Sequence, residues 1–149
     1  MASVKGANFT NISASPVVKA SSENVGGKLR VWHDTYEASS LASGSDISIA
    51  KIPAYATIHD VVIKADALGG SSTLIAGDSG DTNRFIDVVG TWNVAGQSQS
   101  MLGGSSTGAP VPAVTGLGHR YTSETDVLIT TGGATISGTI YSWVFYSTE

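Results

Sequence analysis

The chain has 149 residues, a formal net charge of -4 and no cysteine. This length is typical of one domain with a sizeable core, which needs neither a disulfide nor a metal to fold. The lack of cysteine excludes thiol catalysis, iron–sulfur clusters and cysteine zinc sites. Charged residues make up 13% of the chain, about half the usual share, and the acidic balance provides no basic surface for nucleic acid. Such a low-charge surface suits contact with a protein or with an uncharged ligand.

The sequence also indicates where the chain is made. No apolar run reaches the roughly 18 residues that a membrane-spanning helix needs. The first residues, MASVKGANFTNISASP, lack the apolar core of a secretory signal. We therefore expect no membrane contact, and synthesis in a cytoplasm, with the protein working there or in something assembled there.

Residues 1–27 are polar, rich in serine, asparagine and small residues, and end in Gly26-Gly27. This composition predicts an extended N-terminal arm, with a disordered terminus as the alternative. A few apolar side chains could dock the arm on a neighbouring molecule; they are Val4, Phe9, Ile12, Val17 and Val18.

Short β-branched runs separated by turn residues predict antiparallel strands in the next part of the chain. The first strand covers residues 28–37 and alternates, so that Arg30, Trp32, Asp34 and Tyr36 share one face. Further strands are predicted over residues 45–52, 58–65, 73–76 and 84–89. The strand over residues 45–52 stops at Pro53, which has no N–H to donate to a strand ladder.

Residues 90–120 break this rhythm and are rich in glycine, serine, proline, alanine and glutamine. A loop of this length inside a compact domain is functional, disordered, or contains short strands that the pattern does not reveal. Its bulky anchors are Trp92, Met101 and Leu102, which we expect to act as docking elements together with the arm.

Two more strands, over residues 121–131 and 134–147, complete the chain. In the last strand, Tyr141, Trp143 and Phe145 share one face, and isoleucine and valine side chains share the other. An apolar strand of this kind is either central with both faces covered, or presents its aromatic face to a partner. Seven or eight strands with almost no helix signal predict an all-β, antiparallel, jelly-roll-like β-sandwich over residues 28–149, in preference to a closed barrel.

Motifs that could carry catalysis are weak. Gly77-Asp78-Ser79-Gly80 resembles the nucleophile segment of trypsin-like proteases, but only in four common turn residues. His33-Asp34 and His59-Asp60 look like paired bases and carboxylates, yet adjacent residues of a strand point to opposite faces. We therefore expect no enzyme, no catalytic residue and no bound cofactor.

The acidic segment around Asp78, Asp81, Asn83 and Asp87 offers oxygen ligands for a hard cation, but its spacing does not fit an EF-hand. Aspartate and asparagine also bond to their own backbone in tight turns, which is the preferred interpretation. We expect Arg84 to pair with a carboxylate of this segment or to cap it, and no metal to be held. The three tryptophans could form a sugar-stacking platform, although core or interface positions are more typical of a small β protein.

Three segments, in this order, resemble a widespread group of small structural proteins of tailed phages, and together they cover around half of the chain. They are Val25–Val31 with Asp34–Glu37, then Ile52-Pro53-Ala54 through Asp66–Gly69 to Gly77–Phe85, and finally Tyr121–Gly133. The glycine- and serine-rich loop and the residues before Val25 depart most from the pattern.

This group is similar to head decoration, or cement, proteins. The resemblance implies a β-sandwich, often a dimer or trimer, that binds the outside of the assembled capsid and clamps adjacent subunits of the major capsid protein. It implies a virion location after synthesis in the host cytoplasm, and it names no catalytic residue. Two alternatives stay open: a glycan- or receptor-binding module of a tail fibre, and a low-copy component of the tail or neck.

Overall fold

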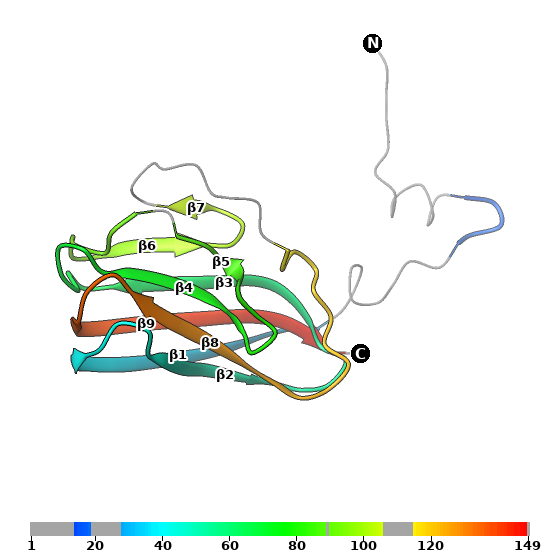
Figure 1. The fold of residues 1–149 in the computed structure, drawn as a ribbon. Helices are drawn as coiled ribbons and strands as arrows, with labels where there is room; N and C mark the ends of the chain where they lie inside the picture. The colour runs from blue at the N-terminus through cyan, green and yellow to red at the C-terminus, as the bar shows by residue number, and fades with distance from the viewer. Residues whose placement is uncertain (1–13, 19–27, 89, 106–114, 149) are drawn as a thin grey trace, which may run out of the picture.

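The computed structural model describes residues 14–18, 28–88, 90–105 and 115–148, and in these ranges it contains strands and turns but no helix. Two antiparallel sheets lie face to face (Figure 1). The strands are β1 (Lys28–Leu41), β2 (Asp46–Ile52), β3 (Thr57–Ala65), β4 (Thr73–Asp78), β5 (Asp81–Ile86), β6 (Gln97–Ser100), β7 (Gly104–Ser105), β8 (Thr125–Gly132) and β9 (Ile136–Thr148).

The strand order is that of a jelly roll. One sheet has the order β1-β9-β3-β6-β7 and the other the order β2-β8-β4-β5. Early strands pair with late strands, β1 with β9, β2 with β8, β3 with β6 and β4 with β5. This nesting brings distant parts of the chain together, as two Greek keys do. The predicted fold class, an all-β antiparallel sandwich, is confirmed.

The core lies between the two sheets and follows from the period-two pattern of the strands. Along β8, and along β3 from Val61, alternate side chains are buried while the intervening ones are partly or fully exposed. Such alternation buries one face of each strand against the facing sheet. The fully buried aliphatic and aromatic side chains include Ile52, Ile58, Val61, Ile63, Phe85, Ile86, Val127, Ile129, Ile136 and Val144.

Strand β9 is central in its sheet, between β1 and β3. Ile136, Ile140 and Val144 face the core, as predicted, with at most 1% of each side chain exposed. The opposite face carries Tyr141 and Trp143, which are half-buried. The strand is therefore central, but its aromatic face lies on the outside of the sandwich.

One expectation about the loops needs correction, and for the long loop one of the alternatives left open, short strands, is the one observed. The acidic segment is a tight hairpin in which Asp78 ends β4 and Asp81 begins β5, so β5 starts three residues before the predicted strand at Arg84. The long loop contains β6 and β7, which extend the first sheet beyond β3. Strand β6 reads QSQS, and a strand without apolar residues gives no hydrophobic period to detect.

Trp92 and Met101 do not match their predicted role as docking residues. Only 2% of Trp92 and 4% of Met101 is exposed, so both side chains belong to the core. The backbone of Trp92 is also held, because its N–H donates to Ser72 and its carbonyl accepts from Leu68. These large side chains point into the core and anchor a glycine-rich segment to the sandwich, instead of projecting into solvent.

Candidate functional site

The outer face of the five-stranded sheet carries an aromatic row. Trp143 stacks on His33 of β1 with ring centroids 4.8 Å apart and planes 3° from parallel, and Tyr141 stacks on Trp143 at 6.5 Å. The His33 ring is fixed by a hydrogen bond of 3.0 Å between its Nδ1 and the carbonyl oxygen of Ser142. Phe145 continues the row beside Val31, which is 54% exposed.

This row results from strand register. Because β1 and β9 are antiparallel, His33 lies opposite Trp143 and Val31 lies opposite Phe145. Residues directly opposite on paired strands project from the same face of a sheet and stabilise each other. The row is therefore a preformed apolar surface of low conformational entropy, which is the kind of surface that aromatic interface residues provide.

A second surface lies at the edge where β1 and β2 come together, at the bottom of Figure 1. The inner face of β1 is not covered here, so Trp32 is 39% and Tyr36 is 37% exposed. A groove of about 220 Å³ runs between the edges of the two sheets. Its lining comes from β1, β2 and β9, namely Asp34, Thr35, Tyr36, Ile47, Ser48, Ile49, Ile140 and Ser142.

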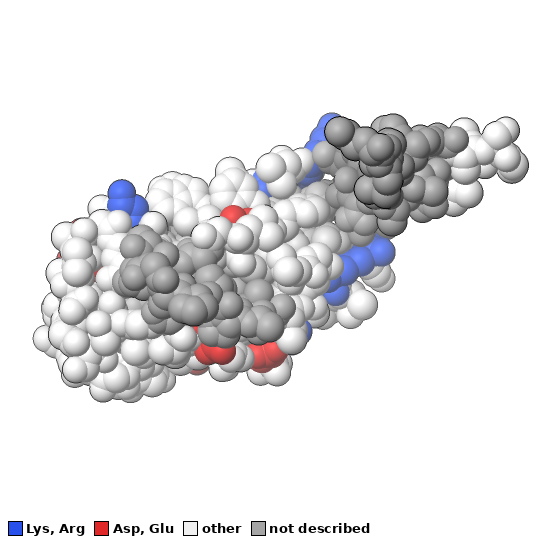
Figure 2. Space-filling view, turned by 90° about the horizontal axis from the view of Figure 1, so that it is seen from above, with Lys and Arg blue, Asp and Glu red and all other residues white. Residues whose placement is uncertain are grey.

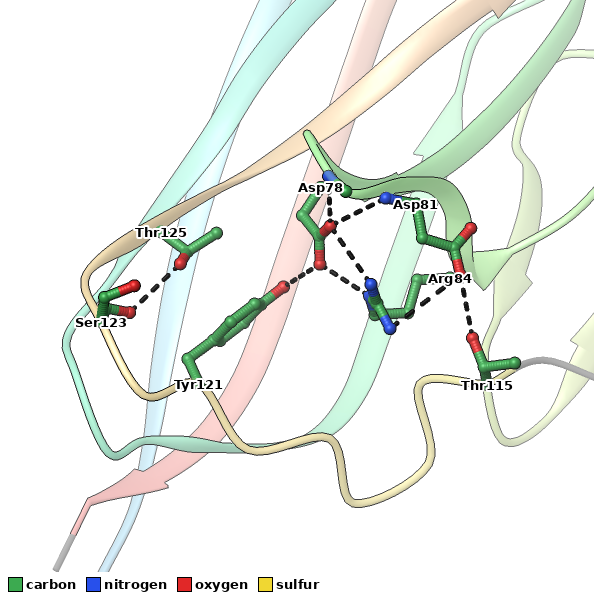
Figure 3. Close-up of polar contacts among 8 residues, drawn as sticks. Asp78, Asp81, Arg84, Thr115, Tyr121, Ser123 and Thr125 are labelled. Atoms are coloured by element: carbon green, nitrogen blue, oxygen red, sulfur yellow. Dashed lines mark hydrogen bonds and ion pairs between the residues drawn. The ribbon is translucent and has the colours of Figure 1, made fainter.

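A polar cluster centred on Asp78 holds the β4–β5 hairpin (Figure 3). Its Oδ2 accepts from Arg84 Nε at 2.7 Å and from the Tyr121 hydroxyl at 2.8 Å. Its Oδ1 accepts the backbone N–H groups of Gly80 at 2.9 Å and of Asp81 at 3.0 Å. The predicted pairing of Arg84 with a carboxylate of this segment is confirmed.

The pKa values of the cluster follow from these contacts. Burial alone would raise the pKa of Asp78, but donors from Arg84, Tyr121 and Gly80 together hold the pKa below its usual value. Burial and the bond to Asp78 raise the pKa of the Tyr121 hydroxyl, which stays protonated. Burial, helped by the Arg84 guanidinium, lowers the pKa of His119.

This cluster is structural in character because its carboxylate is saturated with donors. Asp78 is 4% exposed and accepts from four groups, so it is not available as a base for Ser79 of the protease-like motif. The Tyr121 bond ties the segment before β8 to the β4–β5 hairpin, and Thr115 adds a bond of 3.0 Å to Asp81. Sequence reasoning missed Tyr121 because its partner lies 43 residues away.

The other predicted motifs are not joined in the fold. His33 lies on the outer face while Asp34 lines the groove, and Asp60 bonds to Ser100 instead of to His59. Among the described residues, no group of three histidine or acidic side chains is placed to hold a metal ion. No helix in the same ranges is long and apolar enough to cross a membrane.

The predicted interface residues fall into several places. Val4, Phe9 and Ile12 lie outside the described residues. Val17 and Val18 are 68% and 51% exposed, and Leu102 is 62% exposed beyond β6. Figure 2 shows one face of the molecule, on which basic and acidic side chains are few and scattered.

The fold and these surfaces define a jelly-roll sandwich that exposes apolar side chains on its outer face and at its β1 edge. Comparison with solved structures found chains of the same fold in phage capsids. A chain of the cyanophage Pam1 capsid asymmetric unit has a TM-score of 0.61 and 19% identity, over 89% of this chain and 93% of that one.

A chain of the capsid of Ralstonia phage GP4 has a TM-score of 0.55 and 17% identity, over 83% of this chain and 84% of that one. A chain of the acidic stable capsid of Helicobacter pylori bacteriophage KHP30 has a TM-score of 0.53 and 12% identity, over 80% and 86%. At these identities the likeness concerns the fold. The sequence matches no protein-family model, and no curated protein matches it.

Proposed function

We propose that this chain is a structural protein of a phage virion, and that it decorates the outside of the head by binding adjacent subunits of the major capsid protein. The observation that carries the proposal is the fold-wide similarity to chains of phage capsid structures, which extends over at least 80% of this chain in each case. The resemblance of the sequence segments to decoration proteins supports the same role.

The surface chemistry supports binding by contact area. The aromatic row of Tyr141, Trp143 and Phe145 with His33 is a preformed apolar surface, and charged residues are only 13% of the chain. On a repeating capsid, several weak contacts engage together, and simultaneous engagement multiplies their effect. We assign the arm, residues 1–27, and the exposed Leu102 to secondary contacts of this kind.

Copy number tests the proposal. The chain should be quantified by mass spectrometry in purified particles against the major capsid protein. A ratio near one to one, or a simple fraction of it, is the expected result for lattice decoration. A few copies per particle would place the protein in the tail, neck or fibre, and absence from particles would refute a virion role.

Head binding by variants then tests the surfaces. Deleting residues 2–24 should leave a folded protein that no longer binds heads, and Trp143→Ser should weaken binding by about tenfold or more. Tyr55→Ser is the matched control, because Tyr55 is 58% exposed and lies outside the aromatic row. Equal binding by the Trp143 and Tyr55 variants would show that the row is not the contact surface.

A further inference from the structure

Strand β1 is a long edge strand with exposed side chains. It pairs with β9 on one side, and its other side is the edge of the five-stranded sheet. It carries four large hydrophobic side chains that are exposed, Leu29, Val31, Trp32 and Tyr36. An edge of this kind is a template for pairing with another strand, and natural proteins cover or block it.

The charges along β1 are arranged with opposite signs about Trp32. Lys28 and Arg30 precede the tryptophan, and Asp34 follows it. All three side chains are exposed, and none of them takes part in an ion pair within the part of the chain that the structure describes. Like charges would protect an edge against its own copy, whereas this arrangement is complementary to itself.

We propose that β1 pairs antiparallel with β1 of a second copy across a two-fold axis that passes beside Trp32. A two-fold axis perpendicular to the sheet keeps the inner face of one copy aligned with the inner face of the other. Because residues directly opposite point to the same face, even-numbered residues of one copy lie opposite even-numbered residues of its partner.

This register pairs the inner-face side chains usefully. Arg30 of each copy lies opposite Asp34 of the other, so that two symmetric ion pairs form. The two Trp32 rings meet on the axis, and Lys28 lies opposite the ring of Tyr36, where an ammonium group has a favourable cation–π contact. On the outer face, the exposed Val31 is covered by His33 of the other copy.

Neighbouring registers that preserve the faces pair these residues less well. With the axis beside His33, Trp32 lies opposite Asp34 and no ion pair forms. With the axis beside Asp34, the two carboxylates lie opposite each other and repel. With the axis beside Val31, Lys28 takes the carboxylate and Arg30 lies opposite Trp32, so the bidentate geometry that only an arginine–carboxylate pair offers is lost. The register beside Trp32 alone gives both arginines a carboxylate.

Charge reversal on the full chain tests the pairing. By sedimentation velocity, the parent protein is expected to form dimers, and Arg30→Asp or Asp34→Arg alone should raise the dissociation constant by about tenfold or more. An equimolar mixture of the two single variants should dimerise again, because each copy then supplies the charge that the other lacks. Lys64→Glu is the control for Arg30→Asp, because it makes the same change of net charge on exposed residue 64 of β3, away from the edge.

Cysteine cross-linking tests the register, since the chain has no cysteine of its own. Opposite residues of antiparallel strands have Cα atoms about 4.5–5.5 Å apart, which a disulfide can bridge. Among single variants at Val31, Trp32 and His33, oxidation should join copies fastest through Trp32→Cys. A mixture of the Arg30→Cys and Asp34→Cys variants should also cross-link, and both of these variants retain Trp32.

A monomeric parent chain at high micromolar concentration, or a trimer, would overturn the proposal. A dimer that resists both charge reversals, or one that cross-links fastest at Val31 or His33, would overturn the register. Circular dichroism of each variant verifies that the exposed substitutions leave the fold intact. The inference accompanies the proposed capsid role, since the resemblance to decoration proteins implies self-association, but these assays use the free chain, so their failure is distinct from failure of head binding.

Discussion

Replacing Asp78 with asparagine removes the charge at the centre of the polar cluster while keeping the shape of the side chain. The amide oxygen can still accept from Gly80 and Asp81, so the hairpin turn keeps its two bonds. The amide nitrogen, however, then takes the place of Oδ2 and faces both the Arg84 Nε–H and the Tyr121 hydroxyl. The variant therefore separates the contacts of Oδ2, the Arg84 ion pair and the Tyr121 bond, from those of the turn.

The size of the effect follows from burial. The side chains of Asp78 and Arg84 are 5% and 19% exposed, and the Nε–Oδ2 distance is 2.7 Å. Removing one partner of a buried pair costs about 3–5 kcal/mol, and the partial exposure of Arg84 places this pair at the lower end. We expect a loss of about 3 kcal/mol at pH 7, or roughly 6–12 °C in Tm for a domain of this size.

The pH dependence gives a second, independent test. The pKa of Asp78 in the folded chain lies below the value of 3.8 that it has when unfolded. Its contribution to stability is thus complete above pH 3.8 and is lost as the pH falls through the folded pKa, because the unfolded chain binds the proton first. The difference between parent and Asp78→Asn should therefore shrink on acidification below about pH 4.

Urea unfolding at pH 7 and at stepped pH values down to 3 measures both effects. Asp126→Asn is the matched control, because Asp126 contacts Lys51 at 3.2 Å but both side chains are about half exposed. Such surface pairs contribute little, so this variant should keep the parent's stability. If Asp78→Asn were as stable as Asp126→Asn at pH 7, the structural role assigned to the cluster would be wrong.

Three further outcomes follow from the structure and need only stability measurements. Trp92→Ala should lose about 3–5 kcal/mol because its side chain is buried, whereas Trp143→Ala on the outer face should lose clearly less; equal losses would contradict their placement. Gly77→Ala should lose about 1–3 kcal/mol, because a Cβ there collides with the backbone of β5, while Gly70→Ala meets no atom within 4 Å and is the control. Burial lowers the pKa of His119 below 6.5, so on acidification the imidazole of the unfolded chain is protonated first. The stability of the folded chain should therefore fall as the pH falls from 6.5 through the folded pKa. A plot of Tm against pH should be flatter for His119→Gln than for the parent.

The sequence was sufficient to predict the strands that bury an alternating face. Ile136, Ile140 and Val144 recur with the period of a strand and lie in the core, so both the fold class and the inner face of β9 could be predicted. Strand β6 could not, because Gln97 and Gln99 are buried through hydrogen bonds to backbone carbonyls and not through an apolar pattern. A polar strand of this kind depends on neighbours that only the fold supplies.

The candidate surfaces show a similar division. The aromatic face of β9 could be predicted from alternation alone, but its partner His33 comes from a strand more than a hundred residues away. Conversely, Trp92, which was expected to dock on a partner, is in the core. A bulky residue inside a polar loop can anchor that loop to the sandwich just as well as it can bind a partner. Residue type therefore identified the large apolar groups, while their distribution between core and surface depended on long-range pairing.

The outer sheet face and the β1 edge of this chain differ in their surface chemistry. The outer sheet face presents stacked rings whose positions are fixed by strand register, which suits a partner that offers area without charge. The β1 edge presents charges of both signs around Trp32 that form no ion pair within the described ranges, which suits a partner with the same pattern in reverse. An antiparallel copy of β1 is such a partner. Pairing through the edge would leave the outer face of both copies on one side of a continuous sheet, so self-association and binding of a repeating lattice are geometrically compatible.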